Sequence, residues 1–148
     1  MLAVQRSLLI GAPPARVFEA FTDFATWRHW VPHFHELTPL SGGPLALGYQ
    51  ARIRERFSVV PRLWEVTALE PGRSFAWAAS LLPGLRITVD HVAEPSEDAT
   101  RARLALHVAG PLGLLVAPAA ARLSRRTFDQ SLAALKARLE GEGLVLGL

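Results

Sequence analysis

The sequence has 148 residues, of which 50% are hydrophobic and 20% charged, with a formal net charge of +3 and no cysteine. This length and balance predict one globular domain over residues 1–148 and exclude a disordered or disulfide-stabilised protein. The missing thiols also exclude a cysteine nucleophile and a cysteine metal site. We expect a soluble, cytoplasmic protein, because no signal peptide is evident and the most apolar run, residues 110–121, is too short to span a membrane.

The N-terminal residues predict a strand followed by a helix. Residues 2–10 place most of their large apolar side chains on one parity, and the glycine and prolines of residues 11–14 end the strand. Pro14 suits the first turn of a helix, in which three apolar residues follow at helical spacing. These residues are Val17, Phe18 and Phe21.

A second short helix is predicted from an aromatic repeat. Phe24, Trp27 and Trp30 recur every three residues, and Asp23 is in position to cap the helix before them. Pro32 ends the pattern, because proline cannot continue a helix. We therefore expect a pair of short helices directly after the first strand.

The middle of the chain predicts a set of antiparallel strands. Proline and glycine dominate residues 32–47, which have room for at most a short strand near residues 36–40. Apolar and polar residues then alternate over residues 49–57, which is the pattern of a strand with one buried face. Further strands are expected at residues 63–69, 74–80, 85–92 and 100–108, with turns at residues 70–72, 83–84 and 95–98.

The C-terminal residues 110–143 predict one long helix. An apolar stripe lies on one face and charged side chains on the other, while Gly141 and Gly143 are stop signals. Pro118 is expected to divide the helix, so that residues 111–117 form a looser apolar segment that controls entry to a cavity. The stripe consists of Phe128, Leu132, Leu135 and Leu139.

This order of elements predicts an α+β domain. A curved antiparallel sheet of six or seven strands would wrap around the long C-terminal helix, with the two short helices after the first strand. Space would remain between the sheet and the long helix, because the short helices close only one end. The alternative is an ordinary filled core, since core-facing strands show the same alternation without a cavity.

Three parts of the chain match the pattern of a known family. They are residues 10–18 with Asp23, Trp27 and Trp30, then residues 64–77, and finally His91 with residues 100–112. In these parts the chain resembles the START-like (SRPBCC) superfamily of helix-grip proteins, and within it the polyketide cyclase/dehydrase-type branch. The resemblance covers essentially the whole chain and implies a helix-grip fold with a hydrophobic cavity. It supplies no invariant catalytic motif, because members of this superfamily share a scaffold and differ in activity.

Strand parity predicts which side chains face the cavity. Aromatic and aliphatic residues dominate this set, as is usual for a small-molecule site. Arg125, at the edge of the helix stripe, either extends into solvent or meets a ligand carboxylate. The residues expected to contact a ligand are Trp30, Phe34, Tyr49, Phe57, Trp64, Trp77, Val89, Leu106, Arg125, Phe128 and Leu132.

Two ionisable residues stand on the otherwise apolar parity of their strands. Burial of Glu55 and His91 is expected to move their pKa values toward neutrality, so that the pair could transfer protons in an aldol ring closure or a dehydration. The structural alternatives are a bulge that turns Glu55 outward and a histidine whose ring only hydrogen-bonds a backbone carbonyl.

The remaining polar clusters predict structural roles. His29, His33 and His35 are close in sequence, but Pro32 separates them and no carboxylate completes a metal site, so we expect no metal and no other cofactor. Alternating arginines predict a solvated sheet face rather than a nucleic-acid surface, because no aromatic platform shares their parity. They are Arg52, Arg54, Arg56, Arg101 and Arg103.

The sequence thus favours a protein that binds a small hydrophobic ligand, either aromatic, polyketide-like or lipid-like. One alternative is a polyketide cyclase or dehydratase that uses Glu55 and His91, so enzymatic activity stays open. Another is a module that binds a protein partner or a quinone. We expect no nucleic-acid partner and no stable membrane insertion, and homodimer formation also stays open.

Overall fold

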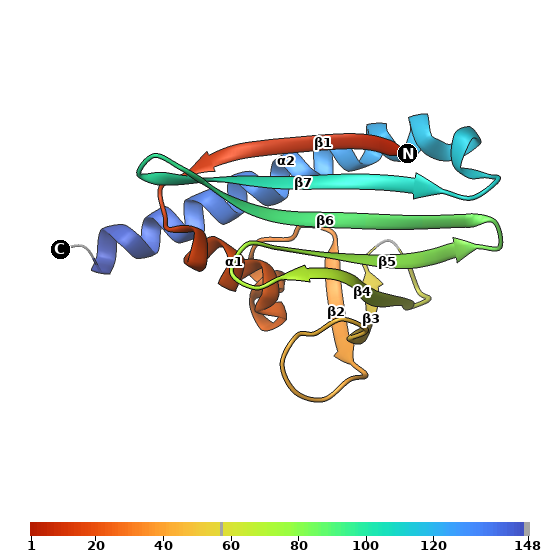
Figure 1. Cartoon of the computed structure of the whole chain (residues 1–148), viewed down its shortest axis with the longest axis horizontal. Helices are drawn as coiled ribbons and strands as arrows, with labels where there is room; N and C mark the ends of the chain where they lie inside the picture. The colour runs from red at the N-terminus through yellow and green to blue at the C-terminus, as the bar shows by residue number, and fades with distance from the viewer. Residues whose placement is uncertain (57, 147–148) are drawn as a thin grey trace.

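The computed structural model describes residues 1–56 and 58–146, except for the side chains of residues 143–146. A strand, two short helices, six further strands and one long helix follow each other along this part of the chain (Figure 1). The elements are β1 (Leu2–Ile10), α1 (Pro14–Thr22), the 3-10 helix η1 (Phe24–His29), β2 (Phe34–Pro39), β3 (Gln50–Glu55), β4 (Arg62–Glu70), β5 (Ser74–Leu82), β6 (Leu85–Ser96), β7 (Ala99–Ala109) and α2 (Gly113–Leu146).

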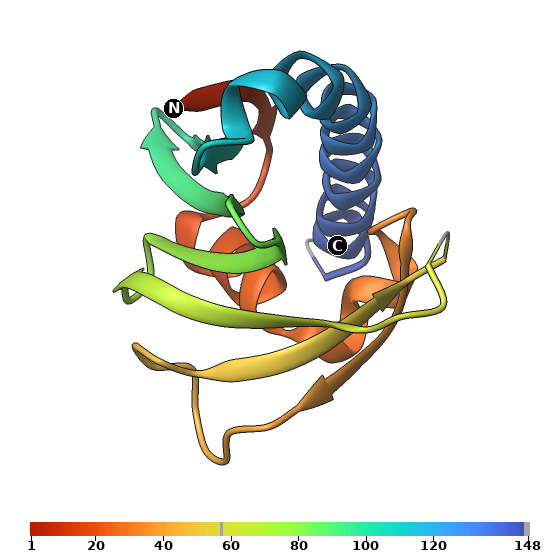
Figure 2. The same ribbon diagram turned by 90° about the vertical axis from the view of Figure 1, so that its right-hand side faces the viewer.

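The seven strands form one antiparallel sheet in the order β1-β7-β6-β5-β4-β3-β2. Figure 2 shows that the sheet curves and that α2 lies on its concave side. The predicted helix-grip architecture is therefore confirmed. The sequence order explains it, because each strand after β2 pairs with its predecessor in the chain and β1 joins the sheet beside the last strand.

The short helices differ from prediction in one respect. Helix α1 begins at Pro14 as expected, and Val17 and Phe21 on it are fully buried. The second element is a 3-10 helix that ends at His29, and the Asp23 side chain makes no capping hydrogen bond. A repeat of three residues fits the three residues per turn of a 3-10 helix, which lines up the aromatic side chains without a capped α-helix.

The long hairpin of β6 and β7 has a shorter turn than predicted. Pro95 pairs with Thr100 inside the ladder, so only Glu97 and Asp98 form the turn, with Glu97 at φ 54°. A two-residue hairpin favours such left-handed backbone conformations. The buried hydroxyl of Thr100 donates to the Ala12 carbonyl at 2.6 Å, which fixes this end of the hairpin against the turn before α1.

Helix α2 packs chiefly on strands β1 and β7 at one side of the sheet. Its predicted stripe of Phe128, Leu132, Leu135 and Leu139 is buried, as expected. On the rim of this contact, the Arg6 guanidinium pairs with Asp129 at 2.7 Å. Because α2 leans toward this side of the sheet, its other flank faces the strands β3 to β6 across open space.

The start of α2 is held by a close backbone contact. The Leu112 amide donates to the Gly84 carbonyl at 3.0 Å, and a Cβ added to Gly110 would lie 2.2 Å from the same oxygen. Only glycine fits there, because its φ is also +99°. This contact ties the β7–α2 connection to the β5–β6 turn.

The predicted division of the helix is only partly right. The segment before Pro118 belongs to α2, which begins at Gly113, and Ala117 is buried. Figure 2 shows the first turns of α2 running at an angle to the rest, as a proline inside a helix produces. The helix continues through Gly141 and Gly143 to Leu146, so the predicted stop signals are wrong. A glycine weakens a helix without ending it when the following residues can still form helical bonds.

Candidate functional site

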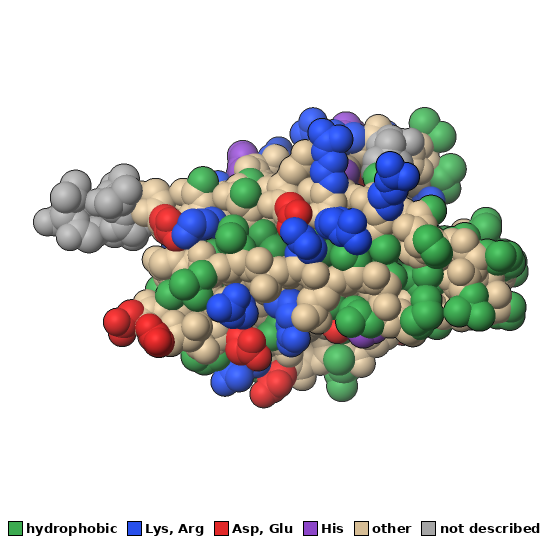
Figure 3. All heavy atoms as spheres, turned by 90° about the horizontal axis from the view of Figure 1, so that it is seen from above, with side chains coloured by type: hydrophobic (Ala, Val, Ile, Leu, Met, Phe, Trp, Pro, Cys, Tyr) green, Lys and Arg blue, Asp and Glu red, His purple; other side chains and the backbone are tan. Residues whose placement is uncertain are grey.

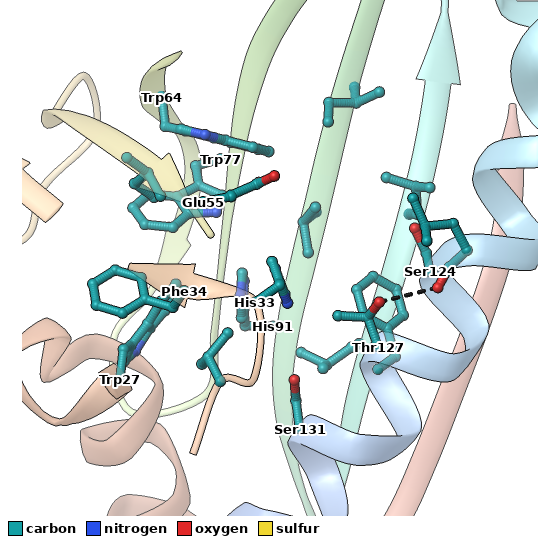
Figure 4. Close-up of a pocket in the computed structure, with 18 of the residues that line it drawn as sticks. Trp27, His33, Phe34, Glu55, Trp64, Trp77, His91, Ser124, Thr127 and Ser131 are labelled. Atoms are coloured by element: carbon teal, nitrogen blue, oxygen red, sulfur yellow. Dashed lines mark hydrogen bonds between the residues drawn. The ribbon is translucent and has the colours of Figure 1, made fainter. Parts of the chain in front are cut away.

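A cavity of about 370 Å³ lies between the concave face of the sheet and one flank of α2. This volume is within the range of about 300–1,000 Å³ typical of small-molecule sites. Figure 4 shows side chains from β3, β4, β5, β6 and α2 converging on it. The lining residues are Trp27, Trp30, Val31, His33, Phe34, Ile53, Glu55, Arg62, Trp64, Trp77, Leu81, Ile87, Val89, His91, Leu104, Leu106, Ala120, Leu123, Ser124, Thr127, Phe128 and Ser131.

Every tryptophan of the chain lines this cavity. The ring centroids of Trp27 and Trp77 are 5.3 Å apart, and those of Trp64 and Trp77 are 5.6 Å apart. The Trp27 indole nitrogen donates to the Phe21 carbonyl at 3.2 Å, which holds its ring in place. Such edge and tilted contacts build a rigid aromatic wall, because each ring restricts the rotation of the next.

The helix contributes hydroxyl groups that sequence reasoning missed. Ser124, Thr127 and Ser131 lie on the flank of α2 that faces the cavity, and the Ser131 hydroxyl points inward (Figure 4). The Thr127 hydroxyl donates to the Leu123 carbonyl at 3.0 Å. Their spacing of three and four residues beside the apolar stripe is the signal that could have identified them.

Nine of the thirteen residues predicted for the site line the cavity, including both ionisable ones. Tyr49 and Leu132 do not line it and are buried elsewhere in the core, and Arg125 is exposed on α2. Phe57 lies outside the described residues. The lining residues among those predicted are Trp30, Phe34, Glu55, Trp64, Trp77, Val89, His91, Leu106 and Phe128.

A single aromatic residue explains the error at Tyr49. Phe24, from η1, lies 6.2 Å from the Tyr49 ring and stacks on Trp77 at 5.1 Å. It also meets Phe75 at 6.3 Å. The end of the concave face under η1 is therefore filled. Tyr49 and Phe75 point to the inner side of the sheet as predicted, but there they pack in the core and do not border the cavity.

Leu132 and Arg125 are misplaced because the helix leans toward β1 and β7. This tilt presses the centre of the apolar stripe onto the sheet, so Leu132 is 1% exposed and belongs to the packed core. Arg125 extends into solvent, which is the usual arrangement for a long cationic side chain at the edge of an apolar stripe.

The Glu55 carboxylate is the acidic group of the cavity. It sits at the end of β3, opposite Phe34 of β2, and points into the space between sheet and helix (Figure 4). Burial raises the pKa of Glu55, and the charge of Arg62 partly opposes this rise. The direction agrees with the sequence expectation. The ladder irregularity nearby falls on the β2 side, between Phe34 and Glu36, and it does not turn Glu55 outward.

His91 is enclosed far more completely than its strand pattern indicated. It is 5% exposed and stacks on Phe75 with ring centroids 4.3 Å apart. Phe21 and Trp27 cover its other sides at 5.5 and 5.8 Å. Burial lowers the pKa of His91 to about 3, while backbone groups of Phe75 and Val89 act in the other direction.

The expected shift of His91 toward neutrality is therefore wrong. A pKa of about 3 leaves the imidazole neutral at pH 7, so it has no proton to give as a general acid and is a very weak base. His91 can still offer a ring nitrogen to a ligand as a neutral group. Of the predicted pair, only Glu55 has a pKa that moves toward the range useful for proton transfer.

The three neighbouring histidines do not gather at one place. His33 lines the cavity, and burial lowers its pKa, whereas His29 and His35 are exposed. Across residues 1–56 and 58–146 no group of three potential metal ligands forms. Among the alternating arginines, Arg52 is exposed and Arg54 approaches Glu36 at 3.6 Å on the outer side of the sheet.

A curved seven-stranded antiparallel sheet that holds a long C-terminal helix over a cavity defines the helix-grip class. Residues 1–140 match the sequence profile of the family described as polyketide cyclase / dehydrase and lipid transport. The chain belongs to this family, which is part of the START-like superfamily.

Comparisons with solved structures show the same fold. A protein of Thermus thermophilus superposes with a TM-score of 0.72 at 17% identity, covering 94% of this chain and 97% of that one. The di-domain ARO/CYC protein BexL of the BE-7585A biosynthetic pathway gives 0.71 at 20% identity, covering 93% of this chain and 46% of that one. The Aha1 dimer of Colwellia psychrerythraea gives 0.64 at 20% identity, with coverages of 93% and 95%. No curated protein matches the chain.

Identities this low establish the fold and leave the activity open, since one scaffold supports many functions. The neighbours illustrate this, because one is an ARO/CYC protein of a biosynthetic pathway and another is an Aha1 protein. In the described part of the chain, no helix is long and apolar enough to cross a membrane.

Proposed function

We propose that the protein binds a small hydrophobic molecule with an aromatic or polycyclic body in the cavity between the sheet and α2. The observation that carries the proposal is the cavity itself, which has a volume of about 370 Å³ and a wall that contains all four tryptophans. Flat aromatic surfaces favour flat ligands, because stacked or edge contacts add to the burial of apolar area.

The polar groups of the cavity restrict the ligand further. Ser124, Thr127 and Ser131 line one wall, and Glu55 with Arg62 lines the opposite side. A pure hydrocarbon would offer no hydrogen-bond partner to Glu55, to Arg62 or to the inward-pointing Ser131 hydroxyl in a desolvated site, which costs free energy. We therefore expect a ligand that carries a few oxygen atoms, such as a polyphenol, an oxidised polyketide or a lipid with a small polar head.

The binding test uses the fluorescence of the protein itself. Titration with 1-anilinonaphthalene-8-sulfonate should quench the tryptophan emission saturably at one site, because every tryptophan lies at the cavity. Saturating ligand should also raise the melting temperature, since binding to the folded state alone stabilises it by about 2.7 kcal/mol at 100 times Kd. Quenching without a rise in melting temperature, or without saturation, would contradict the proposal.

A second candidate function is cyclisation or dehydration of a polyketide. It is favoured by one observation, the Glu55 carboxylate with a raised pKa pointing into the cavity. In an aldol closure, the Glu55 carboxylate would take a proton from a methylene between two carbonyls. The resulting enolate carbon would bond to a ketone carbon, and the new alkoxide would take the proton back from Glu55. Loss of water would then follow.

Replacing Glu55 by glutamine tests this candidate. The variant should slow the consumption of a linear poly-β-ketone thioester while keeping its affinity, because the amide matches the shape of the carboxyl and cannot accept the proton. Glu36→Gln, on the exposed strand β2, is the matched control and should behave like the unaltered protein. Equal turnover by the Glu55 variant, or no turnover by the unaltered protein, would leave binding as the function.

The same variant has a second readout that needs no substrate. Because the folded-state pKa of Glu55 is raised, the folded chain holds this proton more tightly than the unfolded chain, and stability falls as pH rises through the raised value. Glu55→Gln should therefore melt at a higher temperature at pH 7, and the gain should disappear toward pH 4. Partial exposure limits the effect to below about 1 kcal/mol.

A further inference from the structure

An exposed apolar and basic surface lies where α2 begins, next to the cavity. Leu114 and Leu115 are 76% and 78% exposed, and Leu82, the last residue of β5 before the β5–β6 turn, is 56% exposed. The contact of Leu112 with Gly84 joins these two segments into one surface. Figure 3 shows hydrophobic side chains gathered at this end of the molecule, where the β5–β6 turn and the start of α2 meet.

Arginines follow these leucines on the same helix. Arg122, Arg125 and Arg126 are exposed, and none of them takes part in an ion pair in the described part of the chain. Residues 110–128 contain no aspartate or glutamate at all. This half of α2 is therefore a positively charged element with no acidic partner of its own.

The second half of α2 is organised in the opposite way. Asp129 pairs with Arg6 at 2.7 Å, and Glu140 accepts from Lys136 at 2.5 Å and from the Gly11 amide at 2.8 Å. Glu142 pairs with Arg16. Each acidic residue of α2 thus forms an ion pair with a basic residue of this chain. The three arginines of the first half form none in the described part of the chain.

Leu123 is an exposed residue at which the cavity borders this surface. Leu123 lines the cavity and is also 65% exposed, so it stands at the cavity's edge between Arg122 and the inward-facing Ser124. Leu123 therefore lies where the cavity borders the arginine-bearing half of α2.

We propose that the first half of α2, together with the β5–β6 turn, docks on an anionic membrane surface. Protruding leucines enter the boundary of headgroups and acyl chains, and exposed arginines bind lipid phosphates. Unmatched positive charge favours this partner over a second copy of the chain, because two copies of the same arginine cluster would repel each other. The docking is peripheral, and an additional role in passing the ligand to the bilayer rests on the function proposed above.

The full chain should co-sediment with vesicles of phosphatidylglycerol and phosphatidylcholine and stay unbound with pure phosphatidylcholine. Binding should fall at least about tenfold in the double variant Leu114→Ser/Leu115→Ser, and about as much in Arg122→Gln/Arg126→Gln. Raising the salt concentration should weaken the unaltered protein as well, because the charge interaction is screened. All four replaced side chains are exposed, so the fold should persist, which the melting temperature checks.

The matched control changes the same residue types elsewhere. Leu47→Ser/Arg73→Gln alters an exposed leucine and an exposed arginine in the loops before β3 and between β4 and β5, and it should bind vesicles normally. Equal loss in the control, or vesicle binding that ignores lipid charge, would overturn the proposal. So would a concentration-dependent dimer that Leu114→Ser/Leu115→Ser dissociates, since a second copy would then cover the surface. Binding of the fluorescent probe in the cavity should be unchanged in these variants, which separates this proposal from the ligand-binding one.

Discussion

Replacing Ser131 with phenylalanine should weaken binding of 1-anilinonaphthalene-8-sulfonate at least about 100-fold, a loss of about 2.7 kcal/mol. Ser131 is 3% exposed and points into the cavity from the middle of α2 (Figure 4). A phenyl ring at this position would project between the helix and the tryptophan wall. It would take the space that a ligand ring needs within a cavity of about 370 Å³.

The same change should leave the melting temperature equal or higher, which separates a blocked cavity from a damaged fold. A ring that fills empty apolar space gains contacts, whereas a ring forced into a packed core costs about 1–3 kcal/mol. Gln130→Phe is the matched control, because residue 130 is adjacent in sequence and exposed. Affinity should remain normal in that control. Normal affinity in Ser131→Phe would show that the ligand binds elsewhere, and a large fall in melting temperature would show that the region is a filled core.

The architecture could be predicted because it depends on local patterns. Alternation along the strands, proline and glycine at the turns, and one apolar stripe on the last helix each identify an element without knowledge of its neighbours. The bounds of β1, Leu2–Ile10, agree with prediction residue for residue. Errors occur where a neighbouring element determines the conformation. Pro95, predicted in a turn, stays in the β-ladder because it pairs with Thr100 of β7.

The cavity could be predicted only in part, since strand parity separates the inner from the outer face and says nothing about what covers the inner face. Trp77 and Phe75 are both buried on β5, yet only Trp77 lines the cavity, whereas Phe75 is enclosed by the rings of Phe24, Trp77 and His91. These enclosing rings come from three different elements, η1, β5 and β6. The spacing of residues along β5 gives no indication of this difference between Phe75 and Trp77.

The tilt of α2 and the depth at which His91 is buried could not be predicted from the sequence either. An apolar stripe on a helix indicates that one face is buried, but not which strands it packs against. Because α2 packs on β1 and β7, its flank with Ser124, Thr127 and Ser131 faces the cavity. For His91, the pattern indicated burial correctly and could not show that aromatic rings enclose the imidazole from several sides. The number of enclosing groups decides how far a pKa moves, because desolvation grows with burial.

His91 should make the protein sensitive to mild acid. Its folded-state pKa is about 3, against 6.5 for an imidazole in the unfolded chain. Below pH 6.5 the unfolded chain therefore binds a proton that the folded chain excludes, so stability falls as pH falls through this window and is fully present above it. Between pH 7 and pH 5 the loss should be about 2 kcal/mol, or about 4–8 °C in melting temperature.

His91→Phe should remove most of this sensitivity, because the benzyl group keeps the stack on Phe75 and cannot be protonated. The measurement is the melting temperature of both proteins between pH 7 and pH 5, compared as a difference so that any packing change from the larger ring cancels. A smaller slope should persist from His33, whose pKa burial also lowers. His29→Phe is the control and should keep the full slope, since the replaced ring is exposed on the surface. If His91→Phe keeps the full slope as well, His91 contributes nothing to it, and its pKa in the folded protein must be close to that in the unfolded chain. The aromatic rings around His91 would then open often enough to admit water, and a ligand could enter by the same opening.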